Sequence, residues 1–306
     1  MATSITTTYA GEFAGKYISA ALLSADTIEG GGITVKPNVK YKEVMKTLST
    51  NALVKDAACD FADQSTVTLA ERVLQPEEFQ VNLELCKKDF HNDWEAVQMG
   101  YSAFDSLPPS FADFLIGHIA AKVAQKTEEN IWQGVTANAG EFDGFETLLA
   151  ADASVIDVVG TTVTAANVIT EMGKVVDAIP TAVYGKEDLY IYASSNVARA
   201  YIRALGGFGA SGLGAAGLNN EGTTWYNGGD LAFDGVKIFV CSGMSDNTMV
   251  AAQKSNLFFG TGLLADHNEV KLIDMADLDG SQNVRVVMRF TAAVQHGIGA
   301  DIVLYS

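Results

Sequence analysis

The residues best suited to chemistry form two small groups of histidine and acidic side chains. The stretch Ser110–Gly134 carries His118 and the adjacent Glu128 and Glu129. A zinc helix of the H-E-x-x-H type needs a second ligand four residues after the first histidine, but that position is Lys122. Neighbouring residues on a helix point in different directions, so the two glutamates cannot act as a pair. This pattern predicts a structural histidine and solvated glutamates.

The second group lies in the sequence HNDWE, which contains His91, Asp93 and Glu95. On a strand, alternate residues face the same way, so these three side chains could hold a metal ion. Nothing nearby in the sequence supplies the partners that orient metal ligands, and a solvated or interface face is favoured. The chain has no nucleophile elbow, Walker A motif or paired carboxylate motif. We therefore predict no catalytic, cofactor-binding or metal-binding residues, with a metal-dependent enzyme using HNDWE as an alternative.

A glycine-rich segment contains two overlapping matches to a dinucleotide-binding pattern. GFGASG (207–212) and GLGAAG (212–217) both fit G-x-G-x-x-G. The functional fingerprint follows a strand and opens a helix, whereas here a predicted helix precedes the matches and the turn NNEG follows them. The segment is therefore predicted to be a flexible loop without a nucleotide.

One long helix is the clearest structural element of the chain. Pro108 and Pro109 end the preceding segment, Ser110 is placed as the N-cap, and Gly134 is placed as the stop. An apolar row runs along one side at a spacing of four residues, formed by Phe111, Leu115, Ile119, Val123, Thr127 and Ile131. At about 1.5 Å per residue the helix is roughly 36 Å long. Its predicted role is structural support.

Composition narrows the possible classes. The 306 residues are 48% hydrophobic and 19% charged, so the chain can bury a sizeable core. The formal net charge of −17, without a cluster of Lys and Arg, disfavours tight or sequence-specific binding of nucleic acid. No membrane span or signal peptide is predicted. Cys59, Cys86 and Cys241 are widely spaced, which predicts reduced thiols, with a Cys59–Cys86 bridge as the alternative.

Short strands and helices are mixed along the rest of the chain. The strands QSTVTLAE (64–71) and FQVNLEL (79–85) flank a turn at Pro76, which predicts a two-stranded hairpin. Helices are expected at 164–179 and 196–207, a strand at 189–195, and six more strands after residue 235. Because strands and helices do not strictly alternate, the predicted class is α+β.

The first 45 residues and the hairpin bury little surface by themselves. A two-stranded hairpin is marginally stable in water, so both segments are expected to lie on another surface, of their own chain or of a neighbour. The core helices and strands come later in the sequence. Deletion of residues 1–30 is therefore expected to leave a folded subunit.

The order of these elements resembles that of the major capsid proteins of tailed bacteriophages, whose fold is named after the phage Hong Kong 97. SFADFLIGHIAAKVAQKTEENIWQG resembles their spine helix and FDGF the turn after it. LYIYASSNVARAYIRALGG resembles a strand and helix of their axial domain. VRVVMRFTAAVQHGIGADIVLYS resembles their closing stretch, with an arginine, here Arg289, on a long strand.

The resemblance implies a division of the chain into four parts. These are an N-terminal arm (1–55), an excursion called the E-loop (56–86), a peripheral domain (87–155, with the spine helix at 111–133 and a strand at about 276–293), and an axial domain (156–275 with 294–306). It places the glycine-rich loop near the axis of the capsomer. Because only about 55 residues precede the hairpin, it also implies that any scaffolding protein is a separate chain.

The function implied by the resemblance is structural. The chain would be the subunit of an icosahedral or prolate phage head, assembled in the host cytoplasm as pentamers and hexamers around double-stranded DNA. Its partners would be its own copies, a scaffolding protein, a portal and decoration proteins, with no enzyme activity, cofactor, membrane or sequence-specific DNA contact. The shell protein of an encapsulin, a bacterial nanocompartment of the same fold, is the second hypothesis.

Overall fold

The structure is a computed structural model, and it describes residues 26–51, 54, 56–57, 59, 66–86, 109–205, 231–262 and 271–306. The side chains at 109–114 and 277–278 lie outside this description. The helices are α1 Asp26–Glu29, α3 Pro109–Gln133, α4 Phe145–Ala151, α5 Val168–Asp177, α6 Ser195–Leu205 and α7 Ala276–Asp279. The strands are β1 Thr34–Lys36, β2 Glu43–Thr50, β3 Val67–Leu74, β4 Glu77–Cys86, β5 Ile156–Val158, β6 Leu189–Ser194, β7 Ala232–Phe233, β8 Val236–Cys241, β9 Met249–Gln253, β10 Leu257–Gly260, β11 Lys271–Asp274, β12 Asn283–His296 and β13 Val303–Tyr305.

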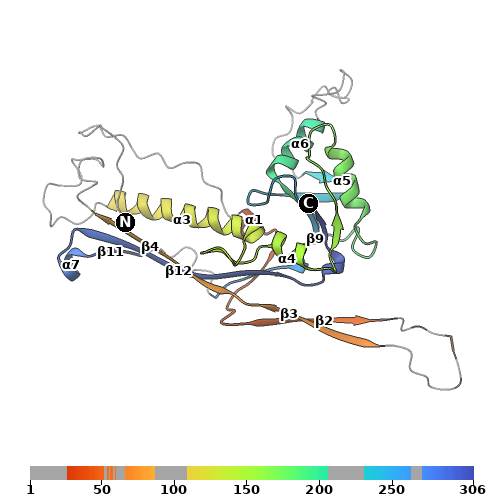
Figure 1. The fold of residues 1–306 in the computed structure, drawn as a ribbon, viewed down its shortest axis with the longest axis horizontal. Coiled ribbons are helices and arrows are strands. Elements are labelled where there is room, and N and C mark those ends of the chain that lie inside the picture. The colour runs from red at the N-terminus through yellow and green to blue at the C-terminus, as the bar shows by residue number, and fades with distance from the viewer. Residues whose placement is uncertain are drawn as a thin grey trace.

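The molecule has an elongated part and an upright part, and a ribbon of two strands projects beneath them (Figure 1). In the elongated part α3 runs alongside β4, β11 and β12. The upright part contains α5, α6 and a six-stranded sheet in the order β5-β13-β9-β6-β8-β7. Both parallel and antiparallel pairs occur in that sheet. Helices and sheets are thus mixed without strict alternation, which confirms the α+β class.

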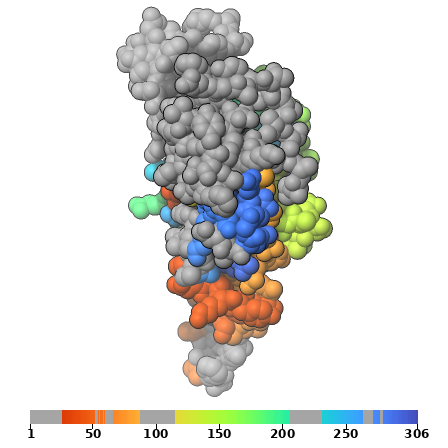
Figure 2. All heavy atoms as spheres, turned by 90° about the vertical axis from the view of Figure 1, so that its left-hand side faces the viewer, coloured from red at the N-terminus to blue at the C-terminus, as the bar shows by residue number. Residues whose placement is uncertain are grey.

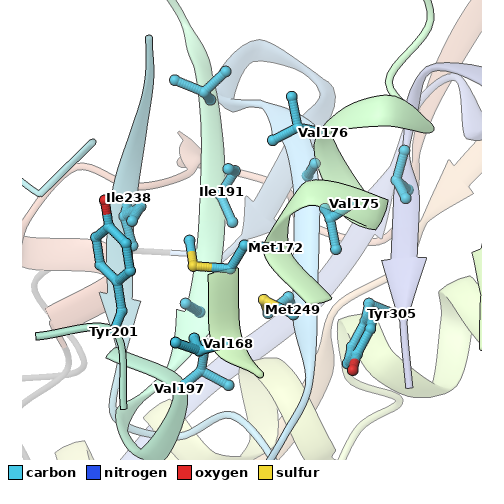
Figure 3. Close-up of a cluster of buried hydrophobic side chains, with 14 of the residues drawn as sticks. Val168, Met172, Val175, Val176, Ile191, Val197, Tyr201, Ile238, Met249 and Tyr305 are labelled. Carbon is cyan, nitrogen blue, oxygen red and sulfur yellow. The ribbon is translucent and has the colours of Figure 1, made fainter. Parts of the chain in front are cut away.

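The six-stranded sheet is covered on one face by two helices. Figure 3 shows Met172 of α5 close to Ile191 and Met249 of the strands, and Tyr201 of α6 beside Ile238. All five side chains are buried in one cluster. The regularly spaced apolar residues of the helices predicted at 164–179 and 196–207 are therefore the ones that contact the sheet. The strand predicted at 189–195 is β6, which lies in the middle of the sheet.

The long strand β12 links the two parts of the molecule. It pairs with β4 along Asn283–Ala292, and its last four residues pair with β10. The strand β11 pairs with its first half. Because β9 leads into β10 and β12 leads into β13, the chain crosses twice between the two sheets, and side chains of both sheets share a second core with Trp132 and Phe145.

The helix α3 lies where it was predicted and ends as predicted before Gly134, with one correction at its start. It begins at Pro109, one residue before the expected cap Ser110, where the fixed φ of proline suits a first helical position. It ends before Gly134, whose Cβ would lie 2.2 Å from the Phe142 carbonyl oxygen. Glycine is required there because the chain folds back tightly along FDGF. Within the row, Ile119, Thr127 and Ile131 are buried, as predicted.

Replacing Ile119 with aspartate is expected to prevent folding. Ile119 is 7% exposed, in the middle of the row that faces the sheet. An unpaired carboxylate buried there costs several kcal/mol, against a total stability of about 5–15 kcal/mol for a typical domain. Soluble expression and circular dichroism measure the outcome, with Lys122→Asp on the exposed side as the control. A folded, soluble Ile119→Asp protein would contradict the assigned face.

The predicted hairpin between 64–71 and 79–85 is wrong in its pairing. The strand β3 pairs with β2, and β4 pairs with β12 instead. Only Gln75 and Pro76 separate β3 from β4. A type I′ hairpin turn needs positive φ at Pro76, which proline cannot adopt, and a type II′ turn needs positive φ at Gln75, where glycine is preferred. The chain therefore passes from the ribbon into the sheet at Pro76. The projecting ribbon is formed by residues 43–50 and 67–74, so the expected boundaries 1–55 and 56–86 do not follow the strand pairing.

Candidate functional site

The ribbon of β2 and β3 has one apolar face that nothing in the described chain covers. Cross-strand pairing places Val44 opposite Val73 and Leu48 opposite Leu69. The two pairs lie on the same face, because side chains an even number of positions apart on a strand point the same way. Leu48 is 65% exposed and Leu69 71% exposed. We call the side chains of Val44, Leu48, Val67, Leu69 and Val73 the ribbon face.

Most of the ribbon face projects away from the rest of the molecule. Figure 1 shows β2 and β3 running beneath the upright part, and in the end-on view of Figure 2 the red-orange atoms lie toward its narrow lower end. Exposed apolar side chains gathered on one face of an isolated ribbon are unfavourable in water and typical of a binding surface. Lys46 and Glu71 form a cross-strand pair of opposite charge within the same face.

The root of the ribbon is held firmly by the subunit. Leu74 is fully buried against Gly260, where an added Cβ would lie 2.8 Å from the leucine Cδ2 atom. Met45 and Ala293 complete this small core. Gln295 Nε2 donates a hydrogen bond of 3.2 Å to the Val73 carbonyl oxygen. The ribbon is thus anchored at one end and free at the other.

A buried polar junction adds to this anchor. The Arg72 guanidinium on β3 donates to the Asp152 carboxylate after α4, and His296 Nε2 on β12 lies 2.8 Å from the same carboxylate. Burial alone would raise the pKa of Asp152, but hydrogen bonds from His296, Ser154 and Arg72 lower it below its usual value. Burial lowers the pKa of His296, which is 1% exposed. Three distant segments of the chain therefore meet at one ionised carboxylate.

The N-terminal arm lies on its own subunit from Asp26 onward. The strand β1 pairs in parallel with β10, and so extends the sheet that contains β12. Thr27 is fully buried beside Glu128 of α3. Its backbone N–H donates to Glu128 Oε2 at 3.2 Å, and its hydroxyl donates to Oε1. Trp132 Nε1 donates to the same hydroxyl oxygen at 3.0 Å, which leaves the hydroxyl proton for the glutamate.

Glu128 corrects a prediction from the sequence. It was expected to be solvated, yet it is fully buried, and burial raises its pKa while the two hydrogen bonds from Thr27 oppose that rise. A buried carboxyl group needs such donors, because without them its desolvation is uncompensated. The side chain therefore fastens the arm to the end of α3. The only signal in the sequence was its position one turn before the apolar Ile131 and Trp132.

The other described residues that were considered for chemistry are not brought together. His118 is half-buried on α3, and Glu129 accepts a hydrogen bond from Gln125 at 3.1 Å. His91, Asp93 and Glu95 and the glycine-rich loop 206–222 lie outside the described residues. Among the residues that are described, no group of three metal-ligating side chains occurs. Cys59, Cys86 and Cys241 are free thiols.

A membrane-spanning helix is not found in the described part of the chain. The longest helix, α3, carries charged residues along its length and does not reach the hydrophobicity that a span requires.

Comparison by sequence gives no relative, whereas comparison by structure gives many. No protein-family model matches the chain, and no curated protein matches its sequence. A capsid chain of the native GTA particle is similar, with a TM-score of 0.60 and 13% identity over 95% of this chain and 93% of that one. The capsid of Myoviridae phage XM1 gives a TM-score of 0.57 and 10% identity over 99% and 94% of the two chains.

A third similar structure comes from another phage. The capsid of cyanophage P-SCSP1u gives a TM-score of 0.55 and 14% identity, and the match covers 100% of this chain and 94% of that one. The elements that carry the sequence resemblance, α3, β6 with α6, and β12 with β13, are all present in the structure. Each of these three structural matches covers nearly the whole chain. The chain therefore has the Hong Kong 97-type fold of bacteriophage capsid proteins.

Proposed function

We propose that this chain is the structural subunit of a phage head, which assembles by itself and with partner proteins into a closed shell around double-stranded DNA. The ribbon face carries the proposal. It exposes five apolar side chains on a ribbon that is anchored at its root and covered by nothing in the described subunit. A second copy of the chain would cover that face, and each copy would then support its neighbour. The shared fold of capsid proteins supports the same role.

The proposed subunit has an arm, a ribbon, a peripheral part and an axial part. The ribbon of residues 43–50 and 67–74 takes the place of the E-loop, α3 with β4, β11 and β12 forms the peripheral part, and the six-stranded sheet with α5 and α6 forms the axial part. Pentamers and hexamers of the axial parts would build the shell. A separate scaffolding protein, a portal and decoration proteins would complete the head in the host cytoplasm. The role is structural, without catalysis or sequence-specific contact to DNA.

The proposal predicts that the purified chain forms large closed particles. Sedimentation velocity and negative-stain microscopy measure this, first on the chain alone and then on the chain expressed with a scaffolding protein. We expect particles in at least one of these preparations, because the ribbon face gains burial only between copies. A chain that sediments as a monomer in both preparations would contradict the proposed function.

A further inference from the structure

A hollow of about 350 Å³ lies on the upright part, between the loop before α5 and the helix α6. Arg199 and Arg203 line it from α6, and Thr164 and Asn196 line it from the loop and the helix start. Figure 1 shows α6 at the end of the upright part that lies farthest from the ribbon. A ligand of this hollow would therefore be separate from any partner of the ribbon face.

The polar side chains that line the hollow differ in whether their hydrogen-bond donors already have partners in the chain. The Thr164 hydroxyl donates to Asn167 Oδ1 at 3.0 Å, and the Asn196 amide donates to Asn247 Oδ1 at 3.0 Å. Arg199 and Arg203 are exposed, and neither has an ion pair within the described residues. The two guanidinium groups are thus the donors left for a ligand.

The two arginines lie four residues apart on one helix, so their Cβ atoms are about 5–6 Å apart. Like charges at this spacing destabilise a helix, and an anion between them would remove that repulsion. The arginines on β3 and β12 that hold carboxylates, Arg72 and Arg285, do so within the chain. The pair on α6 has the same chemistry and has no carboxylate partner among the described residues.

We propose that Arg199 and Arg203 form a binding site for acidic side chains of a second copy of this chain, at the contact between neighbouring upright parts. This inference rests on the proposed function, because it needs copies to meet. The chain has 37 acidic and 20 basic residues, so copies repel one another unless basic groups at their contacts meet carboxylates. Guanidinium groups bind carboxylates in bidentate geometry. An isolated pair in a hollow, on a chain of net charge −17, lacks the extended basic surface that nucleic acid requires.

Charge reversal tests the site. Arg199→Glu and Arg203→Glu are each expected to lower the assembled fraction at least about tenfold, because carboxylates would then face carboxylates across the contact. Lys186→Glu, on an exposed loop of the same part, changes the net charge equally and is the matched control. Sedimentation measures the assembled fraction, and thermal unfolding of the unassembled subunits checks that each variant is folded.

Chemical cross-linking identifies the partner. Arg199→Lys keeps the positive charge and supplies an amine that a carbodiimide joins to an adjacent carboxylate, with the released water taken up by the reagent. In particles mixed from nitrogen-15-labelled and unlabelled subunits, mass spectrometry is expected to find this amide between two copies. The control is the same treatment of the unsubstituted chain, in which position 199 cannot react.

The outcomes separate the inference from the proposed function. If the unsubstituted chain forms no particles, the proposed function fails and the inference fails with it. If particles form and both glutamate variants assemble as well as Lys186→Glu, or if the amide forms only within one copy, the inference alone is overturned. Normal assembly combined with loss of bound DNA in both variants would assign the hollow to nucleic acid and would also overturn it.

Discussion

The double substitution Leu48→Asp and Leu69→Asp is expected to abolish particle formation while the subunit stays folded. The two side chains lie opposite each other on the ribbon face and are among its most exposed members. Charge at exposed positions changes the stability of a subunit by about 0.5 kcal/mol or less. In an assembled shell the same carboxylates would be buried without partners, at a cost of several kcal/mol each. Sedimentation of the variant, together with circular dichroism, measures both effects.

The matched control uses the opposite face of the same ribbon. Ser49 and Thr68 are also cross-strand partners, one position along from Leu48 and Leu69, and both are exposed and polar. Ser49→Asp with Thr68→Asp adds the same charge to the same strands. This control is expected to assemble. Equal loss of assembly in both double variants would show that charge on the ribbon matters and the apolar face does not.

Deletion of residues 1–30 is expected to lower the free energy of unfolding of the subunit by several kcal/mol, contrary to the expectation from the sequence. The deletion removes Thr27, which donates twice to the buried Glu128 carboxylate. A buried polar group left without its hydrogen-bond donors costs about 1–3 kcal/mol, and a charged group costs more. The substitution Thr27→Val removes only the hydroxyl donor and is expected to cost about 1–3 kcal/mol.

Urea unfolding of unassembled subunits measures these changes as a shift in the midpoint at constant slope. Thr34→Val is the control, because the Thr34 hydroxyl donates at 3.0 Å to the neutral Lys254 carbonyl at a half-buried position. It is expected to cost less than Thr27→Val, at about 1 kcal/mol or below. If deletion of residues 1–30 leaves the midpoint unchanged, the arm does not belong to the core of the subunit.

The elements that were predicted well are those whose apolar residues recur at one regular spacing within a single segment of the sequence. The helix α3 has a long row of apolar residues at one spacing, and the segment of β6 and α6 changes from strand to helix at Ser194–Ser195. The order of these elements was enough to indicate the fold. Periodicity is set by one buried face, so it is visible wherever that face is continuous.

Strand pairing and the buried polar contacts could not be predicted in the same way. The partner of β3 is β2, although β4 is nearer in the sequence, and the deciding residue was Pro76. EVMKTLST (43–50) has the β-branched residues and partial alternation of a strand. The strand that pairs with it lies at 67–74, and its own sequence does not indicate that partner. Glu128 and Thr27 are 101 positions apart, so no local pattern in the sequence connects them.

The most direct test of the central claim is an electron cryomicroscopy reconstruction of the assembled particles. The account predicts a closed shell in which the ribbon face of each copy, from Val44 to Val73, is covered by a neighbouring copy. The ribbon root would keep the contacts of Leu74 and Arg72 seen in the single subunit. A shell in which the ribbon face remains open to solvent, or particles in which the chain does not form the wall, would contradict the account.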